Sequence, residues 1–127
     1  MRRLISWGPP LVYMAVIFGL SSLSNPLPEL TQRIWDKLLH TVEYAGLAVL
    51  LARALGREGV SLRRVLVLAV LGASLYGASD EVHQAFVPGR DSTPRDWAAD
   101  TIGGLIGAAA FGFVERRTTA KPLERQR

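Results

Sequence analysis

Four long apolar stretches constrain the fold of this chain more than any other feature. They cover approximately residues 7–23, 35–55, 62–85 and 96–114. Each falls within the about 17–25 residues that a helix needs to cross a bilayer. Because lipid cannot satisfy backbone hydrogen bonds, a crossing segment of this length is expected to be helical. The sequence therefore predicts an all-α, four-helix transmembrane bundle, with residues 1–115 as one membrane domain.

The composition agrees with a membrane protein and excludes several other classes. Hydrophobic residues make up 49% of the 127 residues. There is no cysteine, which excludes disulfides and thiolate metal sites. The net charge of +4 is compatible with nucleic-acid binding, but the basic residues flank apolar stretches instead of lining one polar face. We therefore expect the lipid bilayer as a partner, and no nucleic acid.

The distribution of Lys and Arg predicts the orientation of the bundle. If all four stretches cross, one side carries eleven of these residues: Arg2, Arg3, Arg53, Arg57, Arg63, Arg64, Arg116, Arg117, Lys121, Arg125 and Arg127. The other side carries four: Arg33, Lys37, Arg90 and Arg95. By the positive-inside rule both termini are cytoplasmic (N-in/C-in). The predicted location is the inner, cytoplasmic membrane, with residues 116–127 as a flexible basic cytoplasmic tail.

A cleaved signal peptide is the alternative interpretation of the first stretch. Arg2 and Arg3 would form its basic start, and Ser22-Leu23-Ser24 its cleavage site. The apolar run is long for such a peptide, and cleavage would leave three spans. We therefore favour a retained first span.

Ionisable residues gather at the predicted outer ends of the spans. Charge costs at least about 2.5–3.5 kcal/mol at the centre of a membrane helix, so charges carried into the spans call for a role. Fourteen residues form this group: Glu29, Arg33, Asp36, Lys37, His40, Glu43, Asp80, Glu81, His83, Arg90, Asp91, Arg95, Asp96 and Asp100. Helical spacing places several of them on common faces, as for Asp36, His40 and Tyr44. We expect the outer ends of the last three spans to converge on one shared site.

The residue types in this group suggest two kinds of chemistry. His40, Asp80 and Glu81 are the catalytic candidates, with His40 as general base. Carboxylate oxygens and imidazole nitrogens also bind divalent cations, which makes Asp36, His40, Asp80 and Glu81 the candidate ligands of such a cofactor. The candidate substrate-binding residues are Lys37, Tyr44, Gln84, Arg90, Asp96 and Asp100. A closed salt-bridge network that only orients the helices is the structural alternative.

Three sequence blocks resemble the VanZ-like integral membrane proteins. They are Asp36-Lys37-x-x-His40-x-x-x-Tyr44, Asp80-Glu81-x-x-Gln84-x-Phe86-x-Pro88-Gly89-Arg90 and Asp96-x-x-x-Asp100-x-x-Gly103. The similarity covers roughly residues 10–110, and Ser21-Ser22 also fits it. One departure is Asp100, where the family pattern often has Asn. The resemblance implies a four-span membrane protein and a link to glycopeptide (teicoplanin-type) resistance through the family's namesake, but it supplies no reaction.

Three functional hypotheses follow. The first is a protein that binds or modifies an envelope lipid, a cell-wall precursor or a glycopeptide-type amphiphile, with Lys37 and Arg90 on an anionic head group. The second is a metal-dependent or acid/base enzyme acting on a lipid-linked substrate, oriented by Tyr44 and Gln84. The third is a structural bundle that acts through a partner protein. Proton-coupled transport is less favoured, because the cytoplasmic halves of the spans lack matching polar residues, and oligomerisation stays open.

Overall fold

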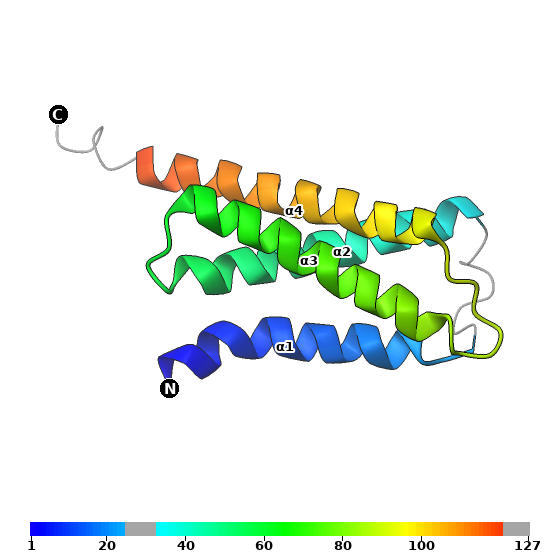
Figure 1. Ribbon diagram of the computed structural model, residues 1–127. Helices are drawn as coiled ribbons and strands as arrows, with labels where there is room; N and C mark the ends of the chain where they lie inside the picture. Colours follow the sequence, from blue (N-terminus) through cyan, green and yellow to red (C-terminus); the bar gives the residue numbers. More distant parts are fainter. Residues whose placement is uncertain (25–32, 121–127) are drawn as a thin grey trace, which may run out of the picture.

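Four long helices make up the protein (Figure 1). The computed structural model describes residues 1–24 and 33–120, and within these ranges it contains no strand. The helices are α1 (Arg2–Ser21), α2 (Arg33–Gly56), α3 (Leu62–Gln84) and α4 (Pro94–Ala120). Glu29 and the side chain of Arg33 lie outside the described residues, as does the tail beyond Ala120. The all-α four-helix fold predicted from the sequence is confirmed.

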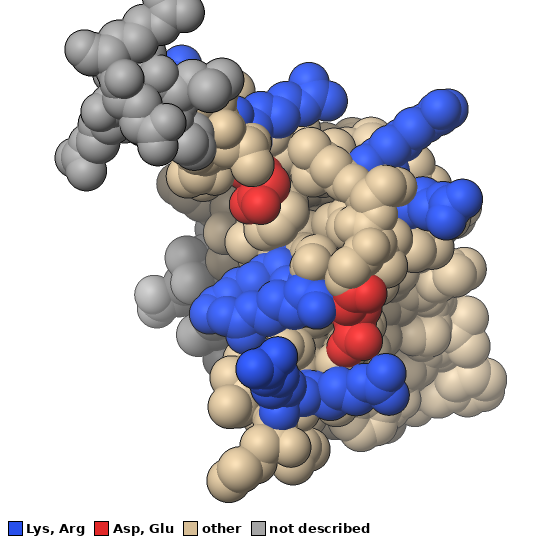
Figure 2. Space-filling model, turned by 90° about the vertical axis from the view of Figure 1, so that its left-hand side faces the viewer, with Lys and Arg blue, Asp and Glu red and all other residues tan. Residues whose placement is uncertain are grey.

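All four helices are long and apolar enough to cross a membrane. The start of α1 and the end of α4 lie at the same end of the bundle (Figure 1). Figure 2 looks at that end and shows Lys and Arg side chains gathered around it. The helix ends and the α2–α3 loop there carry Arg2, Arg3, Arg53, Arg57, Arg63, Arg64, Arg116 and Arg117. The length and composition of the four helices therefore support a multi-pass membrane protein, while the N-in/C-in orientation stays a prediction.

Glycines bring α4 into backbone contact with α2. A Cβ added at Gly103 would collide with the carbonyl oxygen of Thr41, and one added at Gly107 with the carbonyl oxygen of Ala45. Small residues permit such close approach, which is a common way for helices to associate in lipid. Helices α2 and α4 share the most extensive interface in the bundle. This interface fixes how α2 and α4 are rotated about their axes.

Helix α1 packs more loosely than the others. Among the other helices it contacts only α2 and α3, and Leu11, Val12 and Val16 are more than half exposed. Two tyrosines attach it: the Tyr13 hydroxyl donates to the carbonyl of Glu43 (3.0 Å), and the Tyr76 hydroxyl to the carbonyl of Met14 (2.6 Å). The site described next lies at the opposite end of the bundle from the start of α1 and the end of α4 (Figure 1). We call this end the polar end.

Candidate functional site

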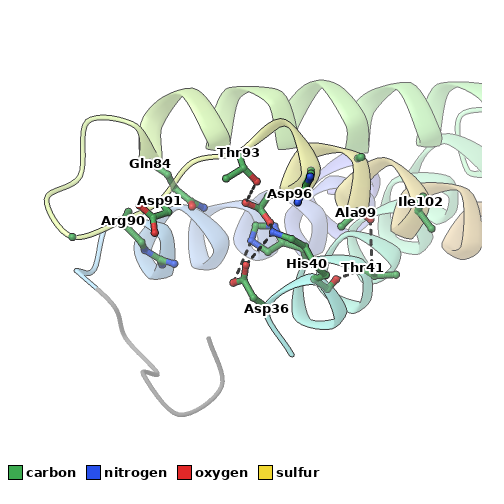
Figure 3. A pocket seen from close by; sticks show the side chains of 14 residues that line it. Asp36, His40, Thr41, Gln84, Arg90, Asp91, Thr93, Asp96, Ala99 and Ile102 are labelled. Carbon is green, nitrogen blue, oxygen red and sulfur yellow. Dashed lines mark hydrogen bonds and ion pairs between the residues drawn. The ribbon is translucent and has the colours of Figure 1, made fainter. Parts of the chain in front are cut away.

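A cleft of about 870 Å³ opens at the polar end, between α2, α4 and the loop that joins α3 to α4. Figure 3 shows Asp36 and His40 from α2 and Asp96 from α4 pointing toward one another across it. Arg90 and Asp91 line it from the loop. Predicted site residues from separate helices therefore do meet, and the cleft walls carry both signs of charge.

Lys37 is the central cation of the cleft. Its ammonium group lies 3.3 Å from Asp36 Oδ2 and also forms an ion pair with Asp96 Oδ1. The Thr93 hydroxyl, just before α4, donates to the other oxygen of Asp96 (2.6 Å). Lys37 is part of a network of ion pairs that joins the start of α2 to the start of α4 at the mouth of the site.

A second pairing lies deeper, between His40 and Asp100. Nδ1 of His40 is 2.7 Å from Oδ1 of Asp100, and both residues are buried, Asp100 completely. Nε2 of His40 lies 4.0 Å from Oδ1 of Asp36, on the cleft side. Asp100 thereby fixes the imidazole ring between the buried interior and the cleft, which is the arrangement that an oriented general base needs.

Glu81 holds the α3–α4 loop in place. Its Oε2 accepts a hydrogen bond from the Ser92 hydroxyl (3.0 Å) and one from the backbone N–H of Thr93 (3.1 Å). Its Oε1 is buried without a hydrogen-bond partner among the described residues. The loop bonds explain why a carboxylate is present at the end of α3, and they leave one oxygen unaccounted for.

A smaller cavity, about 300 Å³, lies beneath α1 and adjoins the cleft. Tyr13, Ile17 and Leu20 of α1 line it, together with Leu39 and Val42 of α2. Four side chains line both spaces and stand between them: Asp36, His40, Gln84 and Arg90. The polar cleft therefore adjoins a cavity that apolar side chains of α1 and α2 line together with the polar side chains of Ser21, Glu43 and Asp80.

Arg90 attaches α1 to the polar end. Its Nε donates to the carbonyl of Leu23 (2.9 Å) and its Nη2 to the carbonyl of Leu20 (2.8 Å). These acceptors lie in and just after the last turn of α1, where carbonyls have no partner within the helix. A guanidinium has five N–H donors, so Arg90 can hold α1 and still donate to a ligand.

The structure divides the predicted substrate-binding residues into two groups. Lys37, Gln84, Arg90 and Asp96 line the cleft, as predicted for a ligand site. Tyr44 and Asp100 are fully buried and line neither cavity. Among the catalytic candidates, Asp80 lines the smaller cavity and accepts a hydrogen bond from Gln84 (3.0 Å), while Glu81 lies outside both.

Sequence reasoning did not assign a role to Arg95, which lines the cleft and is exposed. Its position beside Asp96 in a polar helix start is a signal that could have identified it. Among the described residues, two groups of side chains have the spacing of a metal site: Asp36, His40 and Asp96, and His40, Glu81 and Asp100. Asp80, a predicted ligand, belongs to neither group.

The sequence pattern of the VanZ/LLP1 family matches residues 5–115. The match spans all of α1 beyond its first turn, both α2 and α3, and most of α4, so it includes every residue of the cleft. No curated protein and no solved structure gives a significant match.

Proposed function

Because the chain belongs to the VanZ/LLP1 family and its polar cleft adjoins an apolar cavity, we propose that it binds an anionic amphiphile at its outward-facing end. The ligand class comprises envelope lipids, lipid-linked cell-wall precursors and glycopeptide-type amphiphiles. A polar head group would occupy the cleft and an apolar chain the cavity beneath α1. The junction of the two spaces at Asp36, His40, Gln84 and Arg90 carries this proposal.

Which basic side chains can contact the head group depends on the ion pairs and hydrogen bonds that each already makes. Lys37 is engaged with Asp36 and Asp96, and Arg90 with carbonyls of α1. Arg95 is exposed and takes part in no ion pair among the described residues, so its guanidinium is ready for a phosphate or carboxylate. Arg90 and Arg95 are the proposed anion contacts, and Lys37 keeps the cleft assembled.

Lipid binding by purified protein tests this proposal directly. A long-chain lipid with a phosphate monoester head group is titrated against a zwitterionic lipid of the same chains. Arg95→Gln removes one charge-assisted hydrogen bond and is expected to weaken binding by about 10-fold or more. The matched control is Arg64→Gln, at the opposite end of the bundle. Equal affinity in wild type and Arg95→Gln would contradict the assigned contact.

The apolar cavity has its own test. Val42 lines it and is 62% exposed, so Val42→Trp can fill the space without entering the core. We expect this variant to lose affinity for the long-chain lipid but to keep its affinity for a short-chain analogue with the same head group. Val67→Trp, at an exposed site on α3, is the control. Equal losses for both ligands would refute a chain-binding role for the cavity.

We also propose that the polar end faces outward from the cytoplasmic membrane. The support is the basic end of the bundle, which the positive-inside rule places in the cytoplasm. The chain has no cysteine, so single cysteines are clean reporters. In intact cells, a membrane-impermeant maleimide is expected to label Asp91→Cys and to label Thr119→Cys only after permeabilisation. The reverse pattern would overturn the orientation.

A second candidate function is catalysis on a lipid-linked substrate. The observation that favours it is the buried 2.7 Å contact between His40 and Asp100, with His40 also lining the cleft. In this proposal His40 acts as general base. Lipids extracted from cells that carry the gene should contain the reaction product, which lipids from cells without the gene should lack. Cells that carry the His40→Gln variant should show the same lipids as cells without the gene. Lipid profiles that are identical in all three would exclude this activity.

A further inference from the structure

The buried group of His40, Glu81 and Asp100 holds two carboxyl groups and one imidazole. The three side chains come from α2, α3 and α4 and are each at least nine-tenths buried. Among the described residues, no Lys or Arg forms an ion pair with Glu81 or Asp100, and His40 is the one ion-pair partner, for Asp100. Buried charges in proteins are paired or coordinate metals, so two ionised carboxylates here require a counter-charge in addition to His40.

Unpartnered oxygens point to the same group. Oε1 of Glu81 and Oδ2 of Asp100 are buried and have no hydrogen-bond partner within the described residues. Asp100 is completely inaccessible and Glu81 is 6% exposed. Leaving such atoms unsatisfied costs about 1–3 kcal/mol each, and more when they are charged. A bound cation would satisfy both oxygens at once.

The geometry of the group suits one small ion. One ligand atom from each of the three residues lies within 4.8 Å of the other two. Ligands held tetrahedrally at the usual zinc distances of about 2.0–2.2 Å lie about 3.3–3.6 Å from each other. Side-chain rotations would therefore have to close the site. His40 Nδ1 and Asp100 Oδ1, at 2.7 Å, are at hydrogen-bond distance, so binding one ion through both atoms would replace that bond.

The other group with metal-like spacing already holds a cation. Asp36 and Asp96 both pair with Lys37, whose one positive charge offsets one of their two negative charges. A cation there would have to displace Lys37 or bind beside it. The two groups share only His40, which lets variants of their other members distinguish them.

We propose that His40, Glu81 and Asp100 bind one divalent transition-metal ion. An imidazole and two carboxylates, with no thiolate, are ligands that suit Zn²⁺ and Mn²⁺. Three protein ligands leave a tetrahedral ion with one further position for water or a ligand oxygen. Because the ligands come from three helices, the ion would join α2, α3 and α4 directly beneath the cleft. The metal proposal does not rest on the proposed amphiphile, because zinc binding can be measured in the absence of that ligand.

The test uses Zn²⁺ alone. Full-length protein in detergent is treated with a chelator, exchanged into metal-free buffer and titrated with zinc chloride in a calorimeter. We expect one ion per chain and a rise in the thermal unfolding midpoint, because an ion that binds only the folded state stabilises it. Zn²⁺ that neither binds at one equivalent nor raises the midpoint would overturn the proposal and leave protons as the counter-charge.

Matched variants identify the ligands. Glu81→Gln retains an oxygen that can accept the bonds from Ser92 and Thr93, so the α3–α4 loop is preserved while the charge is lost. Glu81→Gln and Asp100→Asn are each expected to weaken zinc binding by more than about 100-fold, since even changes to groups around the ligands cost 10–100-fold. The control is Asp36→Asn, in the other group, where Asp36 already pairs with Lys37. If Asp36→Asn weakens binding as much as Glu81→Gln does, the proposed ligand set is wrong.

A measurement on the wild type guards against variants that fail to fold. X-ray absorption of the zinc-loaded protein is expected to show nitrogen and oxygen ligands with the scattering pattern of one imidazole. A spectrum without imidazole would overturn the assignment of His40. If Arg95→Gln loses lipid binding while its zinc binding is unchanged, the lipid site and the zinc site are separate. The two proposals can then be judged independently.

Discussion

Helices α4 and α1 are attached to the bundle in two different ways. At Gly103 and Gly107, α4 lies so close to α2 that an added Cβ would enter a backbone carbonyl. At Gly8 and Gly19 of α1, an added Cβ would have no neighbour within 4 Å. Helix α1 is connected instead through side chains: Ile17 packs in the apolar core, and Tyr13 and Tyr76 make hydrogen bonds to backbone carbonyls. The close backbone contact fixes α2 and α4 relative to each other, and with them the charged groups that the two helices carry.

The loose side coincides with the apolar cavity. Tyr13, Ile17 and Leu20 of α1 form one wall of it, and Leu39 and Val42 of α2 form another. In the proposed binding mode, a ligand chain entering from the bilayer would displace fewer contacts at α1 than at any other helix. The helices therefore have different structural roles: α2 and α4 fix the polar groups, and α1 covers the apolar part of the site.

The largest expected effect comes from filling the α2–α4 contact. Gly107→Ala places a methyl group against the carbonyl of Ala45, and no side-chain rotation relieves this clash. We expect a loss of about 3 kcal/mol in the free energy of unfolding, the upper end of the range for overpacking. Reversible denaturation in detergent measures it.

Gly19→Ala is the matched control on α1. It meets no atom within 4 Å, and alanine is the better helix former, so stability should stay the same or rise slightly. Equal destabilisation by the two variants would remove the distinction between the tight and the loose side.

Arg90→Ala is expected to have the second largest effect. It removes two hydrogen bonds from a charged donor to the carbonyls of Leu20 and Leu23. Hydrogen bonds to charged groups contribute about 1.5–3 kcal/mol when removed, so a loss of about 2 kcal/mol is expected. Hydrogen exchange should accelerate at the end of α1 and stay unchanged at the centre of α4. Arg95→Ala, which removes no such bond, is the control, and uniform exchange in Arg90→Ala would contradict the attachment role.

The fold could be predicted from the sequence because its signals are local. Each apolar run is long enough to define its own helix, and an even number of crossings brings both termini to one end. The polar end was predictable for the same reason, since His40 and Tyr44 follow Asp36 at helical spacing. Which of these residues line the cleft depends on helix rotation, and that is set by the contacts of Gly103 and Gly107.

Contacts between distant segments could not be predicted. Arg90 pairs with α1 carbonyls 67 and 70 residues away, and no periodicity encodes such a pairing. Glu81 holds the loop residues Ser92 and Thr93, which depends on the path of the chain around its turn. His83 stacks on Phe18 of α1, with ring centroids 4.4 Å apart.

The smallest effects are expected at the tyrosines that attach α1. Tyr76→Phe removes the bond to the carbonyl of Met14, and Tyr13→Phe the bond to the carbonyl of Glu43. Side-chain hydrogen bonds between membrane helices contribute about 0.6 kcal/mol on average and at most about 1.7. Each variant should therefore lose about 0.6 kcal/mol in the free energy of unfolding, measured by reversible denaturation.

Tyr44→Phe is the informative control, because it makes the same chemical change in a different setting. The Tyr44 hydroxyl is completely buried and has no hydrogen-bond partner among the described residues. Removing an unsatisfied buried polar group is neutral or stabilising, since its desolvation cost disappears with it. Tyr44→Phe should thus be at least as stable as the wild type. A loss as large as that of Tyr76→Phe would mean that a bound molecule or ion satisfies the Tyr44 hydroxyl, which would extend the site into the core between α2 and α3.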